Sequence, residues 1–141
     1  MFCLILSFVC VANAAAFSLN VQAGKELVHR VELAAEDRVR MTIKVLGQDL
    51  DSVNLWVVFP NGTSRDYDEI SNFSLKFISE TEGVCELHFD NSYSSDPKLV
   101  TLNYEVEHYF FGIPQIPFIL IAITIFLILI AAGYMIMGKY G

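Results

Sequence analysis

The sequence is poor in cysteine, and its cysteines are badly placed for cross-linking a domain. Two of the three, Cys3 and Cys10, lie in an apolar N-terminal run, and only Cys85 lies further along the chain. Removal of that run would leave a single cysteine, which excludes an intramolecular disulfide. The body of the chain must then be stabilised by packing alone.

Basic residues are also scarce, because nine Lys and Arg stand against sixteen Asp and Glu in 141 residues. Nucleic acids and anionic lipids are bound by clustered Lys and Arg, so we expect no nucleic acid as partner. Catalytic and cofactor motifs are missing too: there is no GxSxG, no P-loop and no His and Cys spacing typical of a metal site. We therefore expect no enzyme activity, no cofactor and no metal.

Cysteine chemistry remains a minor alternative. Cys85 could act as a nucleophile with His29, His88 or His108 as its base. However, the alternation of its segment places Cys85 on the apolar side, and buried thiols are usually inert. We therefore interpret Cys85 as a core residue.

The first fourteen residues predict a signal peptide. Their apolar run ends in Ala12-Asn13-Ala14, which supplies the small residues that a signal peptidase requires. We expect cleavage after Ala14 or Ala16. An uncleaved anchor is the alternative, which the shortness of the run disfavours.

A second apolar stretch, Ile116–Met137, predicts a transmembrane helix. It carries no charge, and at about 1.5 Å of rise per residue it spans roughly 33 Å, enough for a hydrocarbon core of about 30 Å. A buried core helix is the alternative, but such helices rarely lack a polar face. Residues 138–141, with Lys139, would form a short cytoplasmic tail and make the protein single-pass type I.

Between the two apolar ends, residues 17–109 are expected to form an all-β ectodomain. Apolar and polar residues alternate without a break from Arg38 to Val45, as in a strand with one buried face. Further strands are expected at 17–22, 26–33, 53–59, 73–77, 84–89 and 99–106. About seven short strands with strong turn signals between them predict an antiparallel β-sandwich. Residues 110–115 would link this domain to the membrane helix.

Some polar groups suggest modification or ion binding. Carboxylates form two clusters that we place in loops, Asp49 with Asp51, and Asp66, Asp68 and Glu69. Calcium binding is an alternative to simple solvation, but neither cluster has the glycine-containing loop of a calcium hand. Two sequons, at Asn61 and Asn72, make glycosylation feasible on the exported side.

The stretch from Gly83 to Val106 resembles the C-terminal strand pair of the GOLD (Golgi dynamics) domain. In that family a G-x-Y/C-x-hydrophobic strand leads to an F-D-N-S/T-Y/F-S turn and then to a K-x-V-x-L/Y strand. The matching residues are Gly83, Phe89, Asp90, Asn91, Ser92, Tyr93, Ser94, Lys98, Val100 and Tyr104. Short polar side chains suit a tight turn at this point, and Tyr93 is expected to cover the end of the sandwich.

The resemblance implies a jelly-roll-like sandwich on a type I membrane protein. The best-known transmembrane GOLD proteins are cargo receptors of the early secretory pathway. Unlike them, this chain has no coiled coil before the membrane, no coat-binding tail and no disulfide pair. The plasma membrane and the ER or Golgi therefore both remain open as its location.

Two functions of different classes follow. Our main hypothesis is a non-enzymatic, membrane-anchored protein-interaction module, for which cargo binding or protein trafficking is the family's version. It would bind through the sandwich loops or an exposed sheet edge. The alternative is a structural accessory subunit that docks on a larger membrane complex through its helix. That helix has no GxxxG pair and only Thr124 and Tyr134 as polar groups, so strong self-association is not indicated.

Overall fold

The computed structural model describes residues 13–48 and 50–140, so nearly all of the predicted signal peptide lies outside the described residues. The described chain divides into two compact units, one ending at His108 and one beginning at Tyr109. The first unit corresponds to the predicted ectodomain, and the second contains the apolar helix.

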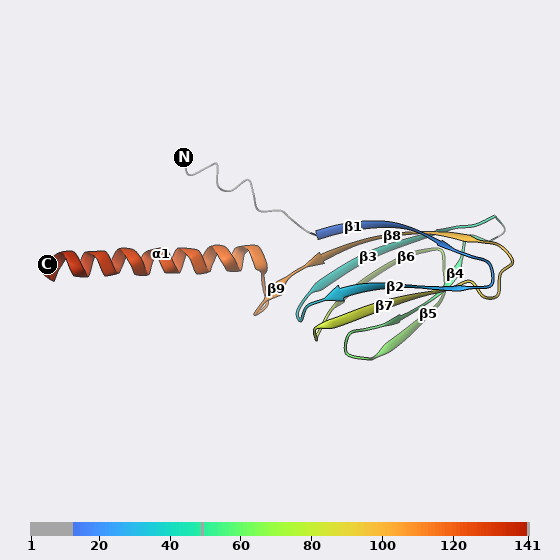
Figure 1. Cartoon of the computed structure of the whole chain (residues 1–141), viewed down its shortest axis with the longest axis horizontal. Helices are drawn as coiled ribbons and strands as arrows, with labels where there is room; N and C mark the ends of the chain where they lie inside the picture. Colours follow the sequence, from blue (N-terminus) through green and yellow to red (C-terminus); the bar gives the residue numbers. More distant parts are fainter. Residues whose placement is uncertain (1–12, 49, 141) are drawn as a thin grey trace. The chain divides into compact units, whose positions relative to one another are not determined.

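Eight strands form the first unit, in two four-stranded antiparallel sheets (Figure 1). They are β1 (Asn13–Val21), β2 (Glu26–Leu33), β3 (Arg38–Leu46), β4 (Val53–Val58), β5 (Ser64–Ile70), β6 (Asn72–Ile78), β7 (Gly83–Asp90) and β8 (Lys98–Glu107). Sheet A has the order β1-β8-β3-β6 and sheet B the order β2-β7-β4-β5. Early strands pair with late ones in both sheets, which is the arrangement of an eight-stranded jelly roll. The predicted antiparallel sandwich is confirmed, with one strand more than expected.

The hydrophobic core lies between the sheets and follows directly from the alternation of each strand. In β3, every second side chain is buried and the others are exposed. Eighteen apolar residues are buried in this core: Val21, Val31, Leu33, Val39, Met41, Ile43, Val45, Val53, Leu55, Val57, Ile70, Leu75, Cys85, Leu87, Phe89, Val100, Leu102 and Val106. Cys85 is a free, fully buried thiol within it, as its phase in the sequence predicts.

The placement of the second acidic cluster in a loop was wrong. Asp66, Asp68 and Glu69 lie within strand β5, at the edge of sheet B. The strand was missed because its solvent-facing positions are charged and only Tyr67 and Ile70 turn toward the core. A register shift in the pairing with β4 and a positive φ of 55° at Asp68 further disturb the alternation.

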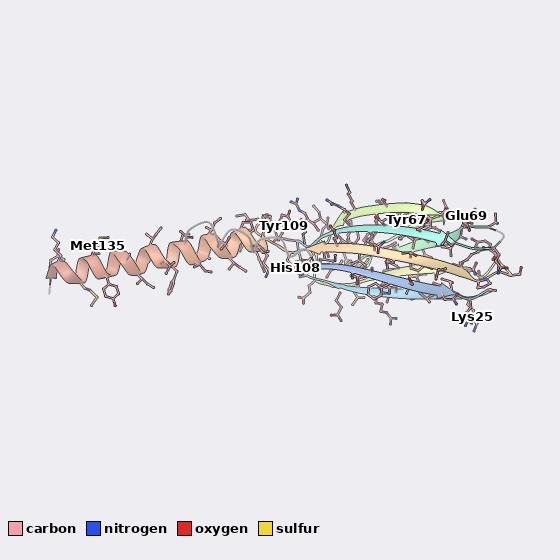
Figure 2. All side chains as sticks on the ribbon, turned by 90° about the horizontal axis from the view of Figure 1, so that it is seen from above. Lys25, Tyr67, Glu69, His108, Tyr109 and Met135 are labelled. Atoms are coloured by element: carbon pink, nitrogen blue, oxygen red, sulfur yellow. The ribbon has the colours of Figure 1, made fainter. Side chains whose placement is uncertain are left out.

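The loops gather at the two ends of the sandwich. Lys25 and Glu69 lie at one end, and His108 lies at the opposite end (Figure 2). The turn after β7, which carries the GOLD-like signature, contacts the β1–β2 turn at the Lys25 end, where Gly24 N donates to the carbonyls of Asn91 and Ser94. We call this the corner end.

The second unit begins with a small hairpin and continues as one long helix. β9 (Tyr109–Phe110) pairs with β10 (Ile113–Pro114) across Phe111 and Gly112, both of which have positive φ as a tight hairpin turn requires. The segment expected to be a plain linker therefore has its own structure. Helix α1 (Gln115–Tyr140) is longer at both ends than the predicted span, and it is long and apolar enough to cross a membrane. The hydroxyl of Thr124 donates to the carbonyl of Leu120 at 2.8 Å within this helix.

Candidate interaction sites on the sandwich

The sandwich has four edge strands, and they differ sharply in how well they are protected. β2 contains three charged residues, and β5 contains four charged residues and an irregular register with β4. β6 contains one charged residue, Lys76. β1, with the sequence NAAAFSLNV, has no charge and no proline over nine residues. Charges, prolines and bulges are the usual devices that stop an edge from pairing with another strand. β1 is therefore the least protected edge of the described sandwich.

The backbone of β1 is bonded on one side only. Its residues pair with β8 from Asn13 opposite Val106 to Val21 opposite Lys98, and no other described strand pairs with it. Alternate N–H and C=O groups along its free side are consequently available to another strand. Because this strand is uncharged, an incoming segment would meet no electrostatic barrier there.

An aromatic cluster fixes β1 against the rest of the sandwich. Phe17 stacks on Tyr104 of β8, with ring centroids 5.7 Å apart, and lies 4.7 Å from the ring of His29 in β2. Burial lowers the pKa of His29, and its Nε2 atom has no hydrogen-bond partner among the described residues. His29 is thus a packing residue of the two-sheet junction. It pairs with Leu87, two residues along β7 from Cys85, and no hydrogen bond joins its Nε2 atom to that thiol.

A hollow of about 280 Å³ lies beside β1 on the outer face of sheet A. It is lined by residues 14–16 of β1, by residues 103–105 of β8, and by Arg40 and Thr42 of β3. The hollow forms because small alanines on β1 stand next to longer side chains on its neighbours. Its lining offers an amide, a hydroxyl, a guanidinium and a carboxylate, which suits a polar ligand better than an apolar one.

The GOLD-like turn is held by the buried side chain of Asn91. Its Nδ2 group donates to the carbonyls of Asp96 at 2.8 Å and of Val21 and Gln22 at 3.3 Å. Asp90 accepts from the N–H of Ser92 at 2.9 Å, as expected of a polar turn. These contacts join the end of β1, the end of β7 and the segment just before β8, so this signature has a structural role at the corner end.

Two further residues of the signature, Tyr93 and Ser94, lie in the same turn. Tyr93 leaves 51% of its surface exposed, so it covers the end of the sandwich only in part. Partial burial and the nearby carboxylate of Glu69 raise its pKa. Ser94 closes the turn, since its hydroxyl accepts from the N–H of Asp96 at 3.1 Å.

Lys98 is buried at the corner end, which its sequence did not indicate. Only 1% of its surface is exposed, and its ammonium donates to the carbonyl of Leu50 and lies 3.8 Å from a carboxylate oxygen of Asp96. That carboxylate also accepts from the N–H of Gln48 at 2.7 Å. Lys98 and Asp96 therefore tie down the loop between β3 and β4, and neither offers a free charge to a ligand.

A polar cluster on the outer face of sheet B surrounds His88. The imidazole stacks on Trp56 with ring centroids 3.6 Å apart, and its two nitrogens lie 2.6 Å from Glu26 and 3.1 Å from Glu86. Arg30 reaches Glu86 at 3.1 Å, and the hydrogen bonds from Arg30 and then His88 lower the pKa of Glu86. Alternation predicts the outward direction of His88, but the stacking that leaves it buried depends on a neighbouring strand.

The remaining candidates are the two sequons, His108 and the first acidic cluster. Asn61 and Asn72 are exposed, and the Asn61 amide oxygen accepts from the N–H and hydroxyl of Thr63 at 3.0 and 2.6 Å. His108 Nδ1 lies 2.7 Å from a carboxylate oxygen of Asp37, and no hydrogen bond to Cys85 occurs among the described residues. Asp51 lies in a loop, Asp49 is outside the described residues, and no group that could hold a metal ion occurs among the residues described.

Comparisons with known proteins give a likeness in structure only. No family model and no curated protein sequence match the chain. Among solved structures it is similar to Aeromonas hydrophila PliG, a periplasmic lysozyme inhibitor of g-type lysozyme, with 12% identity, 68% of this chain and 88% of that chain covered, and a TM-score of 0.49. Salmonella Typhimurium PliG is 13% identical, with 72% of this chain and 94% of that chain covered and a TM-score of 0.49. The Yersinia pseudotuberculosis-derived mitogen is 10% identical, with 71% of this chain and 91% of that chain covered and a TM-score of 0.48. The jelly-roll assignment rests on the strand order, and no function is transferred from these proteins.

Proposed function

We propose that the chain is a membrane-anchored, GOLD-like protein-interaction module that receives an extended segment of a protein partner along β1. The observation that carries this proposal is the open, uncharged edge of β1, of which residues 15–21 remain after the expected cleavage following Ala14. A strand added there would form backbone hydrogen bonds along the edge and would place alternate side chains on the two faces of sheet A.

The local packing of β1 supports such a role. The strand is held from the inside by the stacking of Phe17 on Tyr104, so its edge is presented on a firm support. Its outward side chains are small, namely Ala14, Ala16, Ser18 and Asn20, and they leave room for the side chains of a neighbouring strand. A rigid edge with little side-chain bulk lowers the entropic cost of binding.

The apolar helix and the signal-like N-terminus support the membrane anchor. Helix α1 has the length and composition of a membrane span, and in a type I arrangement the sandwich would face the exported side. The interaction would then take place outside the cytoplasm, at the plasma membrane or in the early secretory pathway. If the chain is homologous to GOLD proteins, this interaction would serve cargo binding or protein trafficking.

The test is photo-crosslinking of the full chain in intact membranes. A photoreactive residue at Ser18 reports on the β1 edge, and the same residue at Glu32, an exposed position of the edge strand β2, is the matched control. We expect adducts with one or a few exported proteins from position 18 only, and loss of these adducts when Ala16→Lys places a charge on the edge. Equal adducts from both positions, or none from position 18, would refute binding along β1.

Replacement of α1 separates this proposal from the accessory-subunit alternative. The interaction module should keep its position-18 adducts when residues 115–140 are exchanged for an unrelated apolar helix. An accessory subunit should instead lose its one stoichiometric membrane partner. The hydroxyl of Thr124 is already bonded within the helix, which leaves little polar chemistry on α1 for a specific contact.

A further inference from the structure

The charge of the ectodomain is distributed very unevenly between its surfaces. Four of the eight basic residues that precede the apolar helix face outward on sheet A, namely Arg38, Arg40, Lys44 and Lys76. Only two of the sixteen acidic residues share that face, Glu105 and Glu107. The outer face of sheet A thus has a net charge of +2, and the rest of the ectodomain has a net charge of −10. We call this surface the basic face.

Three cations of the basic face lack a protein partner. Arg40, Lys44 and Lys76 are exposed and form no ion pair or side-chain hydrogen bond among the described residues. In the register of β3 and β6, Arg40 lies directly opposite Lys76. Like charges in that position destabilise a sheet. Glu105 of β8 lies opposite Arg40 on the other side of β3, but it forms no ion pair with Arg40, and no carboxylate pairs with Lys44 or Lys76 among the described residues. A ligand with negative charge would relieve the remaining repulsion.

Hydrogen-bonding groups lie between these cations. Thr42 pairs with Ser74 on one side and with Asn103 on the other, which forms one row of short polar side chains across three strands. The hollow lined by Arg40, Thr42 and Asn103 opens on the same face, with Glu105 as the one acidic residue of its lining. Cations that flank hydroxyl and amide groups over a shallow hollow are suited to carboxylates carried on an extended chain.

From these observations we infer that the basic face binds an acidic, extended peptide segment of a protein partner, with its carboxylates directed at Arg40, Lys44 and Lys76. A nucleic acid or sugar ring would be expected to stack on aromatic side chains, and the outward residues of sheet A in the described chain include none. An extended anionic surface such as a lipid bilayer would be repelled by the rest of the ectodomain, whose net charge is −10. This site is separate from the edge of β1, and its test is independent of the proposed function.

The experiment measures binding of a synthetic peptide to the full chain in nanodiscs of zwitterionic lipid. The probe is a fluorescent twelve-residue peptide of alternating Glu and Ser, and the control peptide has Gln in place of Glu. We expect the Glu peptide to bind with an affinity that falls as salt is raised, and the Gln peptide to bind at least tenfold more weakly. Failure of the Glu peptide to bind in low salt would overturn the inference.

Charge-removing variants locate the site. Arg40→Gln, Lys44→Gln and Lys76→Gln should each weaken binding about two- to fivefold, and the triple variant should do so about tenfold or more, as exposed ion pairs do. Lys25→Gln and Arg65→Gln remove the same charge away from the basic face and should leave the affinity unchanged. Equal losses in the control variants would overturn the inference, because they would indicate attraction by net charge alone. Tighter binding of a sulfated oligosaccharide, lost in the same triple variant, would also overturn it and assign the face to an anionic glycan.

Discussion

At the scale of single residues, the corner end depends most on Asn91. Its side chain is fully buried and donates to three backbone carbonyls, two at the end of β1 and one in the loop before β8. Asn91→Ala would leave those carbonyls without a donor, which costs about 1–3 kcal/mol. We expect a corresponding fall in the free energy of unfolding, measured by urea titration. Ser92→Ala, at the exposed neighbouring position, is the control and should cost much less.

His29 makes a contribution to the pH dependence of stability that a substitution can isolate. Burial lowers the pKa of His29 below its ordinary value of 6.5. The imidazole of His29 therefore binds a proton more readily in the unfolded chain than in the folded chain. Its contribution to the free energy of unfolding is present above about pH 6.5 and is lost as the pH falls below that value. His29→Leu should reduce the drop in melting temperature between pH 7.5 and pH 5.0. Phe17→Leu disturbs the same cluster without a titrating group, so it should lower stability at both pH values and leave the drop unchanged.

At the scale of secondary-structure elements, alternation decided which strands could be predicted. β3 has a strict apolar and polar phase, so its inward residues follow from the sequence. β2 and β8 follow the same alternation except at a few positions, among them the inward His29 and the buried Lys98. β5 could not be found this way, since four of its seven residues are charged and its pairing is irregular. The open edge of β1 and the basic face were also out of reach, because both depend on which strands are neighbours. Strand order is a long-range property that local pattern does not contain.

The N-terminal end of β1 leads to a prediction about processing. The strand begins at Asn13, and Ala15 and Ala16 pair with Tyr104 and Asn103 of β8. Cleavage after Ala14 would keep these two pairs, whereas cleavage after Ala16 would remove them. We expect the intact mass of the mature protein to place its first residue at Ala15, and a chain that starts at Phe17 to melt at a lower temperature. A mature chain that retains Met1 would contradict this prediction and favour an uncleaved anchor.

At the scale of the whole molecule, the outer faces of sheets A and B differ in whether their charged side chains are paired. On the outer face of sheet B, the charged groups around His88 satisfy one another through Glu26, Glu86 and Arg30. On the outer face of sheet A, Arg40, Lys44 and Lys76 lie without such partners among the described residues, on strands that β8 separates from the unprotected edge of β1. Both candidate binding surfaces therefore belong to the same sheet. A partner that uses both would need an uncharged segment for the edge and an acidic one for the face.

The division into two units predicts that the sandwich unfolds as one body, independently of α1. Cys85 can report on this, since burial and then the charge of Glu86 raise the pKa of its thiol to about 11. At pH 8 only about one native thiol in a thousand is then ionised, and alkylation requires the thiolate. We expect alkylation of the Cys85 peptide, followed by mass spectrometry along a urea series, to rise together with the change in Trp56 fluorescence. The midpoint should stay the same when α1 is exchanged for an unrelated apolar helix. Rapid alkylation of the native protein would contradict the buried, inert role of Cys85 and would favour a catalytic thiol. A shifted urea midpoint would mean that the helix contributes to the stability of the sandwich.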